Sequence, residues 1–435
     1  MSLKIVSTLM TQRRFLPLWL AQTLGAFNDN LFRYALVALA TYQGWTVFGL
    51  DNAVMVPLAA TAFTVPIFAF SAIAGQVADR YDRTKIMRIA KFAEIILMVL
   101  AAIGFLFQLP LALLLTLFLM GVQSTFFLPA RNSALPSLME PHELVPANAA
   151  LSGAINVAIL SGAIGGTLLI APDWGVPLIS ALLVVMAVLG WIAMRQQTPA
   201  PGGNPDLKVR WGLLGVLWET PRMLGHALRA PEVLRPLLGV AWFWMLAAAV
   251  ITVLPLFTRD VLSADEGVVA VFQLIFTIGA ALGAVICGAL SKSGDALRFS
   301  LIGAILLTVF PLDIALYTMN RAPGLELINA ADFLSDRENW RILFDLTLSA
   351  VGGGLFLVPL QAMAQRRAKA EMRGRLLAAS GVLNGLGGTL GPLVLLIIGA
   401  VSAPLQTAFV FVALGSLGAV AFIIWRMLSR RKSPQ

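Results

Sequence analysis

The sequence predicts an all-α polytopic membrane protein with twelve transmembrane helices, arranged as two six-helix pseudo-repeats. Of its 435 residues, 59% are hydrophobic and only 12% are charged, whereas soluble globular chains carry about 25% charged residues. Twelve apolar runs each come close to the roughly 20 residues that a membrane helix needs. Lysine and arginine gather in every second connection between these runs.

The twelve runs fall into two groups of six, separated by a longer polar segment. We place them at residues 15–43, 53–77, 86–107, 110–130, 146–171, 174–194, 234–258, 266–290, 298–319, 341–364, 376–400 and 403–427. We therefore expect an N-terminal bundle at 1–195, a cytoplasmic central loop at 196–233 and a C-terminal bundle at 234–435. In the loop, Trp211, Leu214 and Trp218 share one helical face, which favours an interfacial amphipathic helix over a solvated linker.

Charge sets the expected orientation. Most of the 31 lysine and arginine residues lie in the connections on the side of the two chain ends, and the positive-inside rule places that side, with both termini, in the cytoplasm. The net charge of +9 is explained by this topology, so we expect no nucleic-acid partner. The single Cys287 excludes an intrachain disulfide, and no His/Cys set indicates a metal or a cofactor.

The two halves share landmarks that indicate a repeat. Pro129 and Pro359 end the fourth and tenth runs, and Asn156 and Asn384 lie in the fifth and eleventh at nearly the same offset. Many transporters are built from such repeats and bind their substrate between them, near the bilayer midplane. Chance similarity between apolar runs is the alternative.

The first run carries the strongest candidate for a functional site. Asn28, Asp29, Asn30 and Arg33 interrupt it, and Asp29 comes 12 residues after Pro17. At about 1.5 Å per residue this depth is about 18 Å, in a hydrocarbon core about 30 Å thick. An ionised group there is costly and is therefore a functional candidate that faces a polar cavity. The alternative is an internal Asp29–Arg33 pair that only steadies the helix.

Other polar residues within the runs are weaker candidates. Asn156 and Asn384 can line the cavity or make interhelical hydrogen bonds. Glu94 is expected either to snorkel toward the cytoplasmic end of its helix or to pair with Lys91 or Arg88. Toward the periplasmic ends, acidic side chains can form gate pairs with arginines; these residues are Asp313, Asp345, Arg341 and Arg259.

The segment GQVADRYDRTK, from Gly75 to Lys85, is the most specific short motif. We expect Gly75 to let two helices approach, and Asp79 to cap a helix end or to pair with Arg80 or Arg83. These four residues resemble the G-x-x-x-D-R-x-x-R motif of the major facilitator superfamily, whose usual role is that of a conformational latch. Arg131, just after the fourth run, is interpreted as an anchor or as part of the same latch.

Within that superfamily, three stretches resemble the bacterial lysophospholipid transporter family, in the branch related to transporter–acyltransferase fusions. They are AFNDNLFRYALV, GQVADRYDRTKIMR and FFLPARNSALPSLMEPHELVPANAALSGAINVAILSGAIGG. Asp29 matches the acidic position of the family and Asn30 its neighbour, whereas Asn28 and Arg33 depart from the pattern of some members.

The resemblance implies a secondary transporter of the bacterial inner membrane that works by alternating access. Its implied substrates are lysophosphatidylethanolamine and lysophosphatidylglycerol, moved from the outer to the inner leaflet for reacylation. No acyltransferase domain is found in this sequence, so a cytoplasmic-face acyltransferase is a candidate partner, besides the membrane lipids themselves.

Two other classes of protein are the alternatives to a lysophospholipid transporter. A membrane acyltransferase commonly has an Asp five positions after a His, but Ala147 follows His142 and Pro231 follows His226 at that spacing. The sequence also lacks a Gly-rich phosphate loop and a nucleophilic serine elbow, which argues against an enzyme or an ATP-driven pump. The nearer alternative is a drug/proton antiporter of the same superfamily, in which Asp29 would carry the proton.

Overall fold

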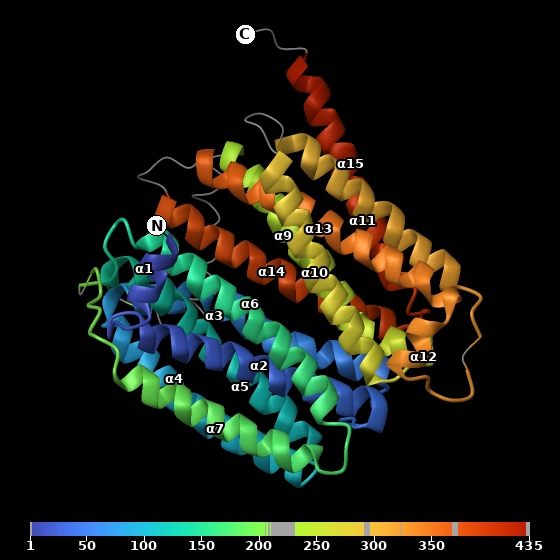
Figure 1. Cartoon of the computed structure of the whole chain (residues 1–435), viewed down its shortest axis with the longest axis horizontal. Coiled ribbons are helices and arrows are strands. Elements are labelled where there is room, and N and C mark those ends of the chain that lie inside the picture. Colours follow the sequence, from blue (N-terminus) through green and yellow to red (C-terminus); the bar gives the residue numbers. More distant parts are fainter. Residues whose placement is uncertain are drawn as a thin grey trace. The chain divides into compact units, whose positions relative to one another are not determined.

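The computed structural model describes residues 2–204, 206–207, 209, 231–290, 296–322, 324–367 and 373–431. Over these residues the chain is almost entirely α-helical (Figure 1). Eleven of the described helices are long and apolar enough to cross a membrane. Helix α2 (Leu16–Gln43) is as long as the others but is not among the eleven, because its middle holds Asn28, Asp29, Asn30 and Arg33.

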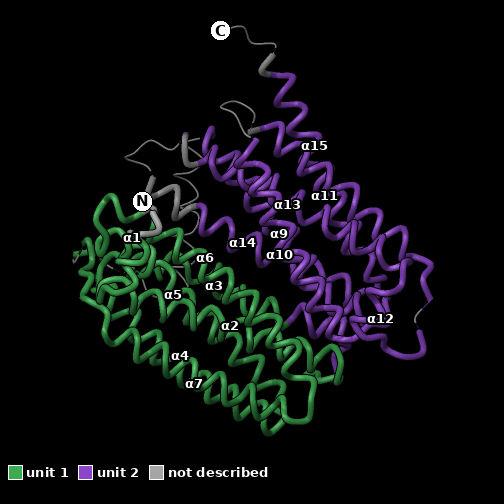
Figure 2. The backbone as a smooth tube through the Cα atoms, viewed as in Figure 1, with its two compact units in different colours: residues 1–48, 59–222 green, residues 49–58, 223–435 purple. Residues whose placement is uncertain are grey.

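The chain divides into two compact units, and each is described here by itself. Unit 1 comprises residues 1–48 and 59–222, and unit 2 comprises residues 49–58 and 223–435 (Figure 2). The first residues of helix α3 (Asn52–Arg80) thus group with unit 2, and the rest of that helix belongs to unit 1.

Unit 1 is a helical bundle preceded by a short N-terminal helix. Besides α2 and α3, its helices are α1 (Ser2–Leu9), α4 (Arg83–Leu106), α5 (Pro110–Leu138), α6 (Leu144–Leu169) and α7 (Gly175–Arg195). Helix α2 packs most extensively against α6 and also contacts α7, while α4 packs against both α5 and α7. The α2–α6 seam is close because Cβ atoms at Gly162 and Gly166 would overlap the carbonyl oxygens of Phe27 and Leu31.

Unit 2 repeats this arrangement with its own helices. They are α9 (Pro231–Asp260), α10 (Glu266–Leu290), α11 (Ala296–Thr318), α12 (Ala330–Ser335), the 3-10 helix η1 (Arg337–Asn339), α13 (Trp340–Arg367), α14 (Arg373–Ala400) and α15 (Thr407–Arg431). Helix α9 packs against α14 as α2 packs against α6, α11 against α15 as α4 against α7, and α11 against α13 as α4 against α5. This shared packing confirms the two predicted pseudo-repeats.

The predicted runs agree with these helices to within a few residues at most ends, and most helices extend beyond the runs. The longest extensions are at α5, which continues through Pro129 and Pro136 to Leu138. The predicted loop at 320–340 is partly structured, because it contains α12 and η1. The amphipathic helix expected around Trp211 lies outside the described residues.

One of the expected pairs forms at the ends of the helices of unit 2. Arg341 donates to both carboxylate oxygens of Asp313, at 2.9 and 2.7 Å, so this predicted pair is confirmed. Arg259 instead lies 3.5 Å from the carboxylate of its neighbour Asp260. Asp345 is buried at the first turns of α13, and one of its oxygens has no hydrogen-bond partner among the described residues.

Candidate functional site

The polar residues in the middle of α2 point to different sides of the helix. Asn28 is fully buried and donates from Nδ2 to the carbonyl oxygen of Leu183 on α7, at 3.2 Å. Asn30 is also buried and donates to the carbonyl oxygen of Ala26 one turn earlier, at 2.8 Å. Each asparagine therefore donates a side-chain hydrogen bond to a backbone carbonyl oxygen, which provides a partner for its buried amide group.

Asp29 faces α5. Its Oδ2 accepts a hydrogen bond of 3.2 Å from the hydroxyl of Ser124. Its Oδ1 is buried and has no hydrogen-bond partner among the described residues. One carboxylate oxygen of Asp29 is therefore hydrogen-bonded to Ser124, and the other can still accept a hydrogen bond from a further donor.

Arg33 lies one turn beyond Asp29 but does not bind it. Its guanidinium donates to Oδ1 of Asn30 at 2.8 Å and lies over two aromatic rings, at 5.0 Å from the centroid of Tyr34 and 5.5 Å from that of Phe63. The internal Asp29–Arg33 pair considered from the sequence is therefore not formed in the described structure. A carboxylate and a guanidinium stand side by side on α2 without neutralising one another directly.

A chain of polar contacts leads from Asp29 to a buried ion pair on α4. The hydroxyl of Ser124 also lies 3.2 Å from Oε1 of Gln123. Gln123 donates from Nε2 to the carbonyl oxygen of Ala90 at 3.1 Å, and lies 3.4 Å from Oε2 of Glu94. The contacts join three helices, because Asp29 belongs to α2, Gln123 and Ser124 to α5, and Glu94 to α4.

The ion pair that ends this chain is sealed within unit 1. The ammonium of Lys91 lies 2.6 Å from Oε2 of Glu94, and the two side chains are only 3% and 2% exposed. The predicted pairing of Glu94 with Lys91 is thus confirmed, while Arg88 binds backbone carbonyl oxygens. The ammonium also lies 5.3 Å from the ring centroid of Phe127, a cation–π contact.

Gly25 makes room for the lysine, and Gly190 lies within ordinary van der Waals distance of it. A Cβ atom at Gly25 of α2 would overlap the Lys91 ammonium, and one at Gly190 of α7 would lie 3.7 Å from it. The ammonium therefore rests against the backbone of α2, one turn before Asp29. No sequence pattern connects these residues, because Lys91 and Gly25 are far apart in the chain and their contact depends on helix packing.

The remaining predicted site residues lie elsewhere. Asn156 of α6 is exposed in unit 1. Asn384 of α14 belongs to unit 2, where its Nδ2 lies 3.4 Å from the hydroxyl of Ser380 and its Oδ1 is buried without a partner among the described residues. Within unit 1, therefore, Asn156 is not part of the polar chain around Asp29.

The predicted latch motif forms backbone hydrogen bonds with the segment that follows α7. The backbone N–H of Arg83 donates to the carbonyl oxygen of Ala200 at 2.8 Å, and that of Asn204 donates to the carbonyl oxygen of Asp79 at 2.9 Å. A Cβ atom at Gly202 would lie 2.7 Å from the backbone of Arg80. Within unit 1, the motif thus joins the α3–α4 turn to the start of the central segment.

Details of this motif differ from the expectation. The residue that caps α4 is Asp82, which accepts a hydrogen bond from the N–H of Lys85, whereas Asp79 is exposed. A Cβ atom at Gly75 would meet no described heavy atom within 4 Å, so close helix approach does not explain this glycine here. Arg131 donates twice to Oδ1 of the adjacent Asn132.

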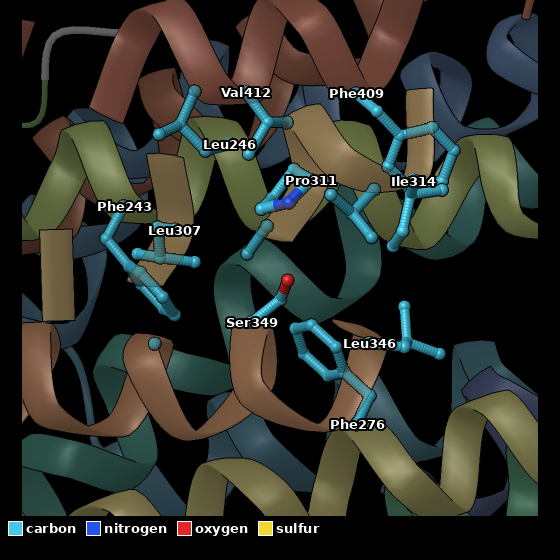
Figure 3. Close-up of a pocket in the computed structure, with 13 residues that line it drawn as sticks. Phe243, Leu246, Phe276, Leu307, Pro311, Ile314, Leu346, Ser349, Phe409 and Val412 are labelled. Carbon is cyan, nitrogen blue, oxygen red and sulfur yellow. The ribbon is translucent and has the colours of Figure 1, made fainter. Parts of the chain in front are cut away.

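Each unit also has one notable cavity. In unit 1 an open, mostly apolar groove of about 640 Å³ runs along α1, α2 and α6, and its walls include Met10, Trp19, Phe27 and Val157. In unit 2 an enclosed cavity of about 20 Å³ lies among Phe243, Leu307 and Phe409 (Figure 3). The hydroxyl of Ser349 points into this second cavity and has no hydrogen-bond partner among the described residues.

Solved structures share this fold. The chain matches a nucleoside transporter, NupG, with a TM-score of 0.64 and 13% identity, covering 94% of this chain and 99% of that one. It matches a peptide transporter, POT, with a TM-score of 0.68 and 14% identity, covering 97% of each chain. At this level of identity the likeness shows the fold alone.

Curated relatives are similar in sequence over most of the chain. The lysophospholipid transporter LplT of Serratia proteamaculans (strain 568) is 25% identical over 377 residues, covering 83% of this chain and 82% of that one. The LplT of Yersinia pestis (strain Pestoides F) is 25% identical over 374 residues, covering 83% and 80%.

A family model described as Major Facilitator Superfamily matches residues 18–322, which is more than half of the chain. That match, the two packed pseudo-repeats and the structural similarities agree. Proteins of this family are secondary transporters rather than enzymes. This chain is therefore a multi-pass membrane transporter that belongs to the Major Facilitator Superfamily.

Proposed function

We propose that this chain moves lysophospholipids from the outer to the inner leaflet of the bacterial inner membrane by alternating access, and that the lipids are then reacylated. The proposal is supported by the similarity to the LplT transporters over most of the chain. In this proposal both termini are cytoplasmic, as the distribution of lysine and arginine indicates. The reacylating enzyme would be a separate acyltransferase at the cytoplasmic face.

The observation that carries the proposal is that Asp29 and Arg33, one turn apart on α2, do not pair with each other. One side chain is acidic and the other basic, both lie in the middle of α2, and they have different partners, Ser124 and Asn30. A zwitterionic headgroup such as phosphoethanolamine offers an ammonium for the open oxygen of Asp29 and a phosphate for Arg33. An acidic and a basic side chain one helical turn apart match two ligand charges of opposite sign.

The apolar groove of unit 1 is consistent with a substrate that has an acyl chain. Its apolar walls include Trp19 and Phe27 of α2, and Phe27 lies one turn before Asn30, which binds Arg33. Phe27 and Arg33 are six residues, or about 9 Å, apart along α2, so an acyl chain in the groove and a phosphate at Arg33 would be less than two helical turns apart. The arrangement suits an amphipathic molecule with one tail, which needs a polar and an apolar surface close together.

Uptake of labelled lysophosphatidylethanolamine into spheroplasts tests the function. The cells would lack their own lysolipid transporter and carry this protein, its Asp29→Asn variant or its Asp173→Asn variant. Asp173 is an exposed residue between α6 and α7, so its substitution is the matched control. We expect uptake with the unsubstituted protein and with Asp173→Asn, and a loss of roughly tenfold or more with Asp29→Asn, since a charge-assisted contact is removed.

Two results would count against the proposal. Normal uptake by a well-expressed Asp29→Asn variant would remove Asp29 from the substrate site. No uptake at all from a well-expressed protein would favour the drug/proton antiporter, for which dye efflux linked to proton entry is the next measurement.

A further inference from the structure

The mechanism proposed above uses Asp29 and Arg33 but leaves the buried Lys91–Glu94 pair without a role. The Lys91 ammonium rests against α2 at Gly25, one turn before Asp29. The charges of both Lys91 and Glu94 act on the Asp29 carboxylate. In the described structure the ammonium nevertheless binds Glu94, at 2.6 Å, and not Asp29.

We propose that Glu94 is a positioning residue that holds the Lys91 ammonium away from Asp29, so that the carboxylate of Asp29 stays available to the cationic group of a zwitterionic headgroup. The inference rests on the proposed lysophospholipid function for its substrate. It assigns to the pair a role in substrate selectivity, beyond the neutralisation of two buried charges.

The charges around Asp29 balance in a way that supports this role. Arg33 shares its helix, and α4 contributes Lys91 and Glu94, so two acidic and two basic side chains interact here. Because Lys91 and Glu94 neutralise one another, Asp29 and Arg33 are left as the two groups available to an external zwitterion. Pairing of Lys91 with Asp29 would abolish this arrangement.

The other helices of unit 1 do not change this balance. Helix α6 has no charged residue over its described length. On α5 and α7 the charged residues are Arg131, which binds Asn132, and Arg195, which lies over the ring of Trp191. On α3 Asp79 and Arg80 lie at the end of the helix.

Removal of Glu94 as the partner should redirect the lysine. A buried ammonium without its carboxylate is strongly unfavourable, and the lysine stem is flexible enough to seek another acceptor. The open Oδ1 of Asp29 is such an acceptor, since it is buried and has no hydrogen-bond partner among the described residues. In Glu94→Gln we therefore expect Lys91 to occupy the place of the substrate ammonium.

Transport of two lysolipids with different headgroups tests this inference. In Glu94→Gln, uptake of lysophosphatidylethanolamine should fall roughly tenfold or more, mainly through a higher KM, because its ammonium now competes with Lys91. Lysophosphatidylglycerol has no ammonium, so its uptake should fall less than about threefold. The double variant Lys91→Met/Glu94→Gln, which lacks the competing charge, should regain most of the lysophosphatidylethanolamine uptake.

Glu143→Gln is the matched control, since Glu143 forms an ion pair of 2.8 Å with Arg14 in the same unit but does not belong to the polar chain around Asp29. A purely structural role for Glu94 would lower uptake of both lysolipids by the same factor. That result, or a double variant that stays selectively defective, would overturn the inference.

A thermal unfolding cycle in detergent tests the same contact without a substrate. Asp29→Asn should lower the Tm only slightly in the unsubstituted protein and clearly more in the Glu94→Gln background, where a new Lys91–Asp29 pair would be lost. Equal effects in both backgrounds would overturn the inference, whatever the protein transports. If the effect of Asp29→Asn on the Tm differs clearly between the two backgrounds but the protein takes up no lysolipid, Glu94 still positions Lys91 and the proposed function is wrong.

Discussion

The two units have the same helical frame but differ in what occupies its centre. In unit 1, Gly162 of α6 packs against the carbonyl oxygen of Phe27, and in unit 2, Gly387 of α14 packs against that of Ala241. Two residues beyond these carbonyls stand Asp29 in α2 and Phe243 in α9. The same place in the repeat thus holds a carboxylate in one unit and an aromatic ring in the other.

The helices that contact these two positions, α5 in unit 1 and α13 in unit 2, differ in the same way. In unit 1, α5 supplies Ser124, which binds Asp29. In unit 2, α13 supplies Gly353, where a Cβ atom would lie 3.0 Å from the ring of Phe243. A polar contact in unit 1 therefore corresponds to close apolar packing in unit 2. The comparison teaches that the repeat specifies the packing of backbones, while the chemistry of each centre is set by a few side chains.

The charged groups of unit 2 lie near the ends of its helices instead. The Arg341–Asp313 pair is half to one-third exposed, at 53% and 31%, whereas the Lys91–Glu94 pair of unit 1 is almost fully buried. Pairs open to water contribute little to stability, and buried pairs are costly to break. The following experiments test this contrast, from the largest expected effect to the smallest.

Lys91→Met should give the largest loss of stability. It leaves Glu94 as an uncompensated charge in an almost closed site, at a cost of about 3–5 kcal/mol. Thermal unfolding in detergent should show a clearly lower Tm than for Asp313→Asn, which breaks the exposed pair of unit 2, and Lys91→Met/Glu94→Gln should recover most of the loss. Equal losses for Lys91→Met and Asp313→Asn would show that the pair of unit 1 is not sealed.

Gly166→Ala and Gly391→Ala should destabilise the two units to a similar degree. The new methyl groups would overlap the carbonyl oxygens of Leu31 and Met245 in the two corresponding seams, and overpacking of this kind costs about 1–3 kcal/mol. Gly418→Ala is the control, because a Cβ atom there would meet no described heavy atom within 4 Å. A fall in Tm for one seam and not for the other would contradict the repeat of the packing.

Ser124→Ala should impair transport more than stability. It removes the hydroxyl that anchors Oδ2 of Asp29 at 3.2 Å, and a hydrogen bond to a charged group is worth about 1.5–3 kcal/mol. We expect lysophosphatidylethanolamine uptake to fall roughly tenfold, with normal expression and a smaller fall in Tm than for Lys91→Met. Unchanged uptake would separate Ser124 from the site.

Ser349→Ala should have the smallest effect. The hydroxyl of Ser349 points into the small cavity of unit 2 and has no hydrogen-bond partner among the described residues (Figure 3). The substitution replaces an unsatisfied buried hydroxyl by hydrogen, which is neutral or stabilising. Uptake and Tm should therefore stay the same or the Tm should rise, and a marked loss of uptake would reveal a functional polar group in unit 2.

The helices of this protein follow from the sequence alone. Apolar runs of about 20 residues can lie in a bilayer only as helices, because each backbone N–H and C=O must then find its partner within the segment. The polar residues of α2 stood out by the same argument, since Asp29 and Arg33 interrupt such a run. The Lys91–Glu94 pair was also accessible, because its members are three residues apart on one helix.

Only the tertiary structure decided which of these groups meet. Asp29 contacts Ser124 across 95 positions of the chain, and Lys91 rests on Gly25 of another helix. Such contacts depend on the rotation and depth of each helix against its neighbours, and apolar periodicity is a weak guide to both when most faces of a helix are apolar. The partners of Asp29, the absence of its pair with Arg33 within the described residues, and the closed site of Lys91 are therefore consequences of packing.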